Sequence, residues 1–478
     1  MLYDSLASGR RRLAIVGGGL SGAALLLALL REGSAMDVVI YEPEAELGPG
    51  LAYGVAAPWH LLNVVATRAS LYANDPDHWW RWAREHGPGL GWPETAAAGP
   101  GDYLPRRLFG HYVVQELDAA RQRQGSVRVL HHRTAAADMT VSDAGVIVTD
   151  AEGRAVQFDT AVLATGAPSS PHFDLPGLAG IRERWNWIDD PWDLPLLAKI
   201  PRDGAVLIVG SALTMADTVL SLARQAHHGP VHVLSRHGVV PAARHEQAPL
   251  PTGISADDGI LLMSQLLHRL RRAVRIHGSE NWQGVFEGLR SCTNDLWLSL
   301  PPQTQRRFMR HLRALWDAHR FRMPPSTAQV LEQMRQDGQL QFHKGNLQRL
   351  VQRSNGGIGV EYRPRGHVSG HVLSVAVIID CTGPRRPETD WADQLLDRLK
   401  ASDLLAGAPC GVGIRATAQG AAVDRLGRSV PGLYLVGPPL RGTLLESMAI
   451  SDIRTQANAL AARLVSTSAG LGAQSLAQ

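Results

Sequence analysis

The feature that most constrains this chain is a glycine-rich turn between two short apolar segments near its N-terminus. The apolar segment 13–16 leads into a G-x-G-x-x-G turn made by Gly17, Gly19 and Gly22. A helical stretch over 23–31 follows, and a second apolar segment, 37–41, ends at Glu42. A strand, a glycine turn, a helix, a strand and an acid in this order predict a Rossmann-like dinucleotide-binding unit.

Each residue type in this unit has a physical role. Gly17 permits the tight turn, Gly19 lets the backbone approach a pyrophosphate, and Gly22 brings the helix close to the strand. The helix N-terminus offers unpaired N–H groups and the positive end of its dipole to phosphates. Glu42 stands where a carboxylate accepts hydrogen bonds from a ribose diol. We therefore expect Gly17, Gly19, Gly22 and Glu42 to bind a dinucleotide.

A second unit of the same form begins at the apolar segment 205–209. Its turn contains Gly210, Ala212 and Met215, and a helix over 213–226 and a strand over 231–234 follow. Glu42 comes 25 residues after Gly17, and the same step from Gly210 reaches Ser235, which Arg236 follows. A carboxylate there would repel a 2′-phosphate, whereas a hydroxyl and a guanidinium bind one. The second unit is therefore predicted to bind NADPH through Gly210, Ala212, Ser235 and Arg236.

The second turn departs from the ideal pattern, because Ala212 and Met215 stand at its second and third glycine positions. Either change would loosen the fit to a pyrophosphate. The alternative is a Rossmann domain that packs without binding a nicotinamide nucleotide.

Two further apolar segments indicate how the domains are connected. Segment 159–164 runs into Thr165 and Gly166, and segment 375–380 runs toward Gly383. Such strands cross between the two domains of flavoproteins that bind two dinucleotides, so Thr165, Gly166 and Gly383 are candidate cofactor contacts. The expected fold is α/β with two Rossmann-like domains, since 478 residues exceed one hydrophobic core. We predict a discontinuous FAD domain (1–170 and 372–478) and an NADPH domain (200–371) that contains a helical insert (about 255–335).

The C-terminal part brings the chain back to the first domain. A strand over 432–436 ends at Gly437, and Thr443-Leu-Leu-Glu446 has the form of a capping box. The pattern predicts a helix from Thr443 to about residue 464, with its positive end at the pyrimidine edge of a flavin. Gly437, Thr443 and Glu446 are therefore candidate cofactor contacts. A plain capped helix that docks on the sheet is the equal alternative.

Taken together, several motifs resemble a known family. They are Gly17–Gly22, Gly48-Pro-Gly50-Leu-Ala-Tyr53, His60-Leu-Leu-Asn63, Leu104-Pro-Arg106, Leu207–Gly210 and Arg441…Glu446. This set resembles the bacterial FAD/NAD(P)-binding protein family, which is distantly similar to flavin-dependent N-monooxygenases. The resemblance implies FAD in the first unit, Asn63 beside the flavin and Arg106 near the FAD phosphates or adenosine. The plainer alternatives are a turn cap for Asn63 and a surface ion pair for Arg106.

The cysteines limit where the electrons of a flavin can go. Cys292, Cys381 and Cys410 are far apart and form no C-x-x-C pair, so no disulfide framework, redox pair or zinc cluster is expected. O₂ or a small organic acceptor remains. The leading hypothesis is an NADPH-oxidising monooxygenase that N-hydroxylates a small polar amine or amino acid. The alternatives are an NADPH-dependent reductase or dehydrogenase without oxygen insertion, and a non-catalytic flavin-binding protein.

The expected helical insert offers two candidate substrate residues. Arginines recur at helical spacing within 305–323, and Arg310 and Arg313 on this face would hold a substrate carboxylate. The commoner arrangement is a solvated face with Arg–Asp pairs. No residue is assigned as a catalytic acid or base.

Composition excludes several other classes. The net charge is +4, and neither a basic run nor an aromatic platform indicates nucleic-acid binding. The first turn interrupts the apolar run 13–30, and no other segment has about 18 uninterrupted apolar residues, so no membrane span is expected. We expect a cytoplasmic protein without a metal site, and the oligomeric state is not predicted.

Overall fold

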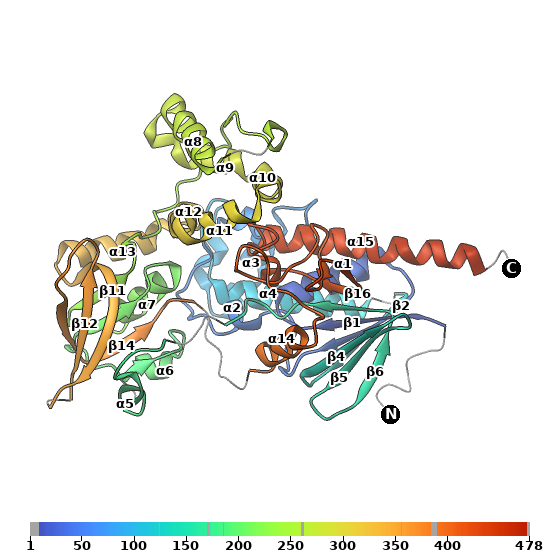
Figure 1. The fold of residues 1–478 in the computed structure, drawn as a ribbon, viewed down its shortest axis with the longest axis horizontal. Coiled ribbons are helices and arrows are strands. Elements are labelled where there is room, and N and C mark those ends of the chain that lie inside the picture. Colours follow the sequence, from blue (N-terminus) through green and yellow to red (C-terminus); the bar gives the residue numbers. More distant parts are fainter. Residues whose placement is uncertain are drawn as a thin grey trace.

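The computed structural model describes residues 9–475, apart from 124, 170–172, 185, 260–261, 355 and 384–389. Two large sheets form two lobes, and a group of helices projects from the junction between them (Figure 1). Each large sheet is built on one of the two glycine-rich turns. The arrangement confirms the expected α/β class with two Rossmann-like units.

The first sheet has six strands in the order β15-β16-β7-β1-β2-β3, all parallel except the edge strand β15. Its strands are β1 (Arg11–Val16), β2 (Met36–Tyr41), β3 (Val127–His132), β7 (Thr160–Leu163), β15 (Ala421–Val423) and β16 (Ser429–Leu435). The central strands read as continuous apolar runs because both faces of the sheet are covered. The sheet therefore joins residues from both ends of the chain.

Helices cover one face of the first sheet and a small meander covers the other. The helices are α1 (Leu20–Glu32), α2 (Gly50–Gly54), α3 (His78–His86), α4 (Arg106–Gln122) and α15 (Ile450–Ser475). The meander is β4 (Ala136–Ser142), β5 (Gly145–Asp150) and β6 (Ala155–Phe158), with α14 (Trp391–Ala401) beside it. Helix α1 ends at Gly33, whose φ of 69° is the left-handed value that favours glycine.

The second sheet has seven strands in the order β13-β12-β11-β10-β9-β14-β8. Its strands are β8 (Trp187–Ile188), β9 (Val206–Val209), β10 (Val231–Ser235), β11 (Leu340–Gln352), β12 (Ile358–Pro364), β13 (His371–Val375) and β14 (Val377–Asp380). Helices α7 (Leu213–Arg224) and α13 (Pro325–Gln336) pack on it, and the short helices α5 (Leu178–Arg182) and α6 (Leu194–Leu197) lie beside it.

The limits of this second sheet differ from the expected domain limits. Strand β14 pairs with both β8 and β9, so residues 377–380 lie in the second sheet although they were expected in the FAD domain. Strand β8 likewise extends the sheet back to Trp187. The apolar run 377–380 is buried between two parallel neighbours, and the chain leaves this sheet only after Asp380.

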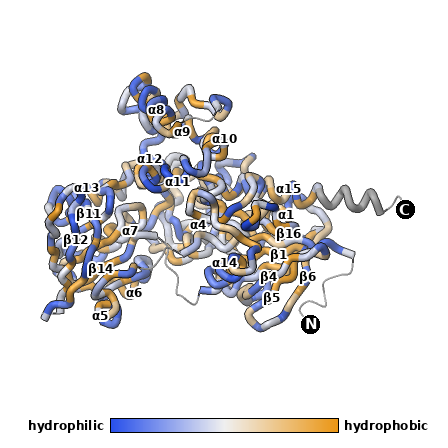
Figure 2. Tube along the Cα trace, viewed as in Figure 1, coloured by the Kyte–Doolittle hydropathy of each residue, from blue (hydrophilic) through white to orange (hydrophobic). Residues whose placement is uncertain are grey.

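The helical insert consists of α8–α12 (residues 263–320). Its helices are α8 (Met263–His277), α9 (Trp282–Leu289), α10 (Thr293–Ser299), α11 (Pro302–His311) and α12 (Arg313–Arg320). Helix α8 projects farthest from the body and carries mostly hydrophilic residues (Figures 1 and 2). The continuous helical face predicted over 305–323 is wrong, because the helix breaks at Leu312. The break lets Phe308 and Arg320 both face the C-terminal segment.

The predicted helix start at Thr443 is also wrong. Helix α15 begins at Ile450, and the Asp452 carboxylate accepts the Ala449 N–H at its start. Thr443 instead binds the backbone of Ile414 and Ala416. A Cβ on Gly442 would lie 1.8 Å from Val412 O, so this backbone is pressed against another loop. Tertiary packing therefore overrides the local capping pattern.

Candidate functional site

The first turn, Gly17–Gly22, has the close backbone contacts that a dinucleotide fingerprint requires. The Gly17 N–H donates to Tyr41 O at 3.0 Å. A Cβ on Gly17 would lie 2.5 Å from Ala164 O, and one on Gly22 would lie 2.0 Å from Gly17 O. No side chain caps the α1 N-terminus at Gly19. Its first N–H groups therefore fit a pyrophosphate.

Segments from four other parts of the chain border the first turn. Gly48 N–H donates to Gly18 O at 2.7 Å, and a Cβ on Gly437 would meet Ser21 Oγ at 2.1 Å. The Cα of Thr165 lies 3.2 Å from the Cβ position of Gly17. The Glu42 carboxylate accepts N–H groups of Gly18 (2.8 Å) and Glu44 (3.1 Å), one on each oxygen. Each oxygen keeps acceptor capacity for a ribose hydroxyl.

The second turn, Gly210–Met215, repeats this geometry. Gly210 N–H donates to Leu234 O at 2.9 Å, and a Cβ on Gly210 would lie 2.5 Å from Cys381 O. The φ values of Gly17 and Gly210 are 105° and 108°. Gly383, two residues after Cys381, thus corresponds to Gly166 after Ala164. The two turns are equivalent at their first glycine.

The two departures at the second turn have different consequences. Ala212 has φ −88° and ψ −164°, close to the −68° and −169° of Gly19, so the alanine keeps the same extended backbone. Met215 is fully buried in the core of the second sheet. A Cβ on Gly22 would collide with the first turn. Because Met215 occupies the equivalent position of the second turn, the start of α7 must lie farther from its strand than the start of α1 does. The second turn is wider but keeps an uncapped helix N-terminus.

Positive side chains gather at the carboxyl end of β10. The Ser235 hydroxyl accepts the Gly238 N–H at 3.0 Å, and exposed Arg236 follows it. Lys344 is the β11 partner of Ser235, and Arg365 Nη1 lies 3.2 Å from His237 Nδ1. Burial lowers the pKa of His237, and Arg365, Arg236 and Lys344 lower it further. This cluster suits a 2′-phosphate, and the sequence pattern did not reveal Lys344 or Arg365.

Arg106, predicted to lie near the FAD phosphates or adenosine, forms an ion pair across the two domains in the structure. Its guanidinium pairs with Asp217 on α7, with Nη1–Oδ2 at 2.7 Å, and Nη2 also donates to Leu61 O at 3.0 Å. The alternative prediction was an ion pair at the surface. Arg106 does form an ion pair, but this pair is buried between the two domains. Asn63 is half-buried and makes no side-chain hydrogen bond within the described chain, so it remains a candidate flavin contact.

The helical insert is joined to the C-terminal segment 437–452 by polar contacts along its length. Trp297 Nε1 donates to Gly442 O at 2.9 Å, and Arg441 donates twice to Asp317 at 2.9 Å. Arg320 donates from two nitrogens to Glu446, both at 2.7 Å. The insert therefore covers the segment that borders the first turn at Gly437.

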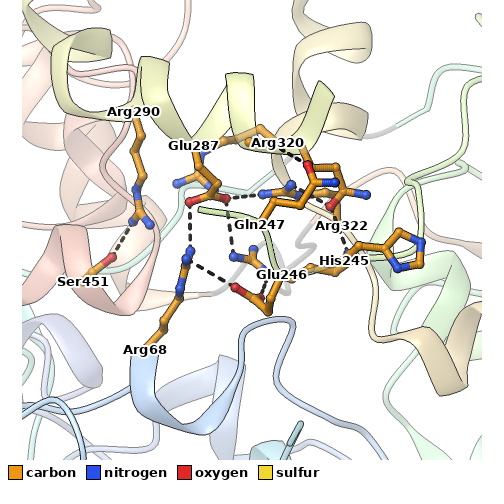
Figure 3. A network of polar contacts seen from close by, with 12 residues as sticks. Arg68, His245, Glu246, Gln247, Glu287, Arg290, Arg320, Arg322 and Ser451 are labelled. Carbon is orange, nitrogen blue, oxygen red and sulfur yellow. Dashed lines mark hydrogen bonds and ion pairs between the residues drawn. The ribbon is translucent and has the colours of Figure 1, made fainter. Parts of the chain in front are cut away.

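Next to this junction lies a partly buried arginine network (Figure 3), made by Arg68, Arg244, Arg322, Glu246, Glu287 and Gln283. Arg68 comes from the first domain and Glu287 from α9, with Nη1–Oε2 at 2.8 Å. Arg322 follows α12 and binds both Glu287 and Gln283. The network thus connects the first domain, the insert and the chain leaving β10.

This network holds an excess of positive charge, because three guanidiniums share two carboxylates. Burial would raise the pKa of Glu287, but Arg244, Arg68 and Arg322 lower it to about 2. Burial and Arg244 lower the pKa of Arg322 to about 10. Arg322 is 1% exposed, and its Nε has no hydrogen-bond partner in the described chain.

The sequence-based candidates for substrate binding lie elsewhere. Arg310 is exposed on α11, and Arg313 pairs with Asp317 at 3.4 Å on α12. Arg310 and Arg313 thus resemble the solvated alternative, whereas Arg320 of the same predicted face is buried against Glu446. The members of the arginine network are far apart in sequence, so no local spacing could have grouped them.

A cleft of about 400 Å³ separates parts of the two domains. Trp59, Leu61 and Trp92 line one side, and Leu220 and Arg224 of α7 line the other.

All three cysteines are described and are unpaired thiols. The described residues contain no cluster of three or more metal-ligating side chains. Of the helices in the described ranges, none is long and apolar enough to cross a membrane.

Comparisons with known proteins agree with this geometry. Residues 14–168 match the family model described as FAD-NAD(P)-binding. The chain is 26% identical over 227 residues to the uncharacterized protein YdhS of Escherichia coli (strain K12). That match spans 46% of this chain and 40% of the E. coli protein, less than half of either.

Solved structures share the fold over nearly the whole chain. One is the ornithine N-hydroxylase KtzI of Kutzneria sp. 744, with reduced FAD, NADP+ and L-ornithine (15% identity, TM-score 0.61, 95% of this chain and 98% of that one). Another is DfoA of Erwinia amylovora, a cadaverine monooxygenase bound to FAD (13% identity, TM-score 0.62, 94% and 92%).

The family model thus assigns FAD-NAD(P) binding to residues 14–168, and the whole chain shares the two-domain fold of the enzymes named above. The expected resemblance to bacterial FAD/NAD(P)-binding proteins, with distant similarity to N-monooxygenases, is confirmed. The residues of the first turn fit FAD, because Gly17 and Gly22 have no space for a Cβ and the helix that begins after Gly19 has an uncapped N-terminus.

Proposed function

We propose that this protein is an FAD-dependent monooxygenase that uses NADPH and O₂ to hydroxylate the nitrogen of a small polar amine or amino acid. The observation that carries the proposal is the pair of turns that are equivalent at Gly17 and Gly210, of which the second ends at a positive cluster instead of an acid. Bound FAD would accept a hydride from NADPH and, once reduced, pass electrons to O₂.

The residues of this chain would bind the two cofactors, orient them and enclose the site between them. Gly17, Gly19, Gly22 and Glu42 would hold the FAD pyrophosphate and ribose, with Asn63, Thr165, Gly166 and Gly437 at the borders of the flavin site. Gly210, Ala212 and Gly383 would hold NADPH, and Ser235 and Arg236 its 2′-phosphate. Thr443 and Glu446 would shape the site from the C-terminal segment, although both side chains already have protein partners.

Enclosure supports oxygen insertion over simple electron release. The insert is fixed to the C-terminal segment by the contacts of Trp297, Asp317 and Arg320, and in this proposal the cover it forms would keep water from the flavin. Because the three cysteines are unpaired thiols, they offer no disulfide that a reduced flavin would reduce. The excess charge of the arginine network favours a substrate with a carboxylate, as in an amino acid.

The decisive experiment is NADPH oxidation by the FAD-loaded protein with a panel of small amines and amino acids under ¹⁸O₂. The expected result is a product that has gained one ¹⁸O atom. Equal substrate turnover without oxygen would instead establish a reductase or dehydrogenase. Failure of NADPH to bleach the bound flavin would overturn the oxidoreductase proposal as a whole and favour a non-catalytic flavin-binding protein.

A further inference from the structure

A buried ion pair joins α4 of the first domain to α7 of the second. Arg106, the first residue of α4, donates to both carboxylate oxygens of Asp217, at 2.7 and 3.3 Å. The two side chains are 17% and 11% exposed. Burial alone would lower the pKa of Arg106, but Asp217 raises it above its ordinary value. The pair therefore stays charged between the domains.

His60 adds a second connection to the same helix. The Ala57 N–H donates to His60 Nδ1 at 3.2 Å, so Nδ1 is unprotonated and the proton lies on Nε2. Nε2–H then faces Ser221 Oγ at 2.9 Å and Asp217 O at 3.2 Å. Trp59 Nε1 also donates to Ser221 Oγ, at 3.2 Å.

Backbone hydrogen bonds within the first domain fix the residues that form its side of this contact. Arg106 N–H donates to His60 O at 2.7 Å, and Leu61 forms a bridge with Pro105. The other half is one face of α7, because Asp217 and Ser221 are four residues apart. The 400 Å³ cleft borders this contact, and Arg68 in the arginine network makes a separate polar connection from the first domain. The contact is therefore local and polar, and polar interfaces of this kind permit relative domain motion.

The position of α7 matters because this helix begins at the second turn. Asp217 lies five residues after Ala212, about 8 Å along the helix axis at 1.5 Å per residue. A tilt of α7 would move its N-terminus and any dinucleotide bound there. A displacement of about 1 Å can cost about a hundredfold in rate.

We propose that Arg106 and Asp217, supported by His60 and Ser221, form an interdomain latch that sets the position of α7 and so of NADPH relative to the FAD domain. This inference rests on the proposed use of NADPH. In this role Arg106 and Asp217 are positioning residues, because their charged groups bind each other and hold the second turn where hydride transfer requires it.

The test compares wild type with the double variant Arg106→Leu/Asp217→Leu, which removes both charges together and so leaves neither one buried without a partner. We expect FAD content and reduction by dithionite to stay unchanged. The flavin reduction rate at saturating NADPH, measured by stopped flow, should fall at least tenfold. The conservative variant Arg106→Lys should recover part of this rate. Glu332→Gln, at an exposed ion pair on α13, is the matched control and should behave as wild type.

A second readout does not depend on activity. Hydrogen–deuterium exchange should increase in segments 57–62 and 213–224 of the double variant. Unchanged exchange in both segments, or an unchanged reduction rate in the folded variant, would overturn the latch. If NADPH does not reduce wild-type FAD, the proposed function fails, and the exchange measurement still decides whether the latch exists.

Discussion

Arg320 donates from Nε and Nη2 to the two carboxylate oxygens of Glu446, and both side chains are buried. One residue ends α12 of the helical insert and the other lies in the C-terminal segment. A buried bidentate pair of this kind is strongly destabilising when one partner is removed, because the other charge remains without compensation. The pair therefore keeps the insert closed over the C-terminal segment.

Replacing Glu446 by Gln should lower the free energy of unfolding by about 3–5 kcal/mol. Thermal or urea unfolding of the FAD-loaded protein measures this loss. The variant should also consume more NADPH per hydroxylated product, because water reaches the opened site. Asp75→Asn, at an exposed ion pair with Arg81, is the control and should leave the melting temperature unchanged. A Glu446→Gln protein as stable as wild type would contradict the proposed role.

Replacing Gly22 by Ala should abolish most FAD binding. The added Cβ would lie 2.0 Å from Gly17 O, so α1 must move away from the first turn. Overpacking of this kind costs about 1–3 kcal/mol, which corresponds to a loss of about five- to more than a hundredfold in affinity. The flavin-to-protein absorbance ratio after titration with FAD measures the effect. Gly180→Ala is the control, because its Cβ would meet no atom within 4 Å.

The positive cluster after β10 should select NADPH over NADH. Arg236→Ala and Lys344→Ala should each weaken NADPH binding by about ten- to a hundredfold, since hydrogen bonds to charged groups contribute about 1.5–3 kcal/mol. NADH binding should change little, because it has no 2′-phosphate. The ratio of kcat/KM values for the two nucleotides measures this preference. Equal losses for both nucleotides would refute the phosphate site.

Glu287 should make the protein sensitive to acid. Its pKa is about 2 in the folded protein and 4.5 ordinarily, so the folded state favours the ionised form. The resulting stabilisation is complete above pH 4.5 and is lost as the pH falls through about 2.

Replacing Glu287 by Gln should therefore reduce stability at neutral pH by on the order of 3 kcal/mol, because Arg322, Arg244 and Arg68 lose their shared carboxylate. The variant should also lose most of the acid dependence between pH 4.5 and 2. Urea midpoints measured across this pH range test both points. A variant with the wild-type pH profile would show that another group causes the acid sensitivity.

Local patterns were sufficient to predict the two Rossmann-like units. The strands, the helices after them and the Gly17–Gly210 correspondence depend on short-range periodicity and on backbone conformations that only certain residues adopt. The 25-residue step that replaces Glu42 by Ser235 also lies within one βαβ unit. These features follow from residues close together in the chain.

Contacts between distant segments required the tertiary structure. Thr443 and Glu446 have the pattern of a capping box, yet their side chains bind Ala416 and Arg320, and the helix begins at Ile450. Arg106 was expected at a phosphate and pairs instead with Asp217, 111 residues away.

The sequence alone therefore located the two Rossmann-like turns with their strands and helices, and it predicted a 2′-phosphate site after the second turn. Only the tertiary structure decided the arginine network, the closure of the insert over the C-terminal segment and the contact of α4 with α7. The physical reason is that a buried charge requires a compensating partner, and which residue supplies it depends on how the chain packs.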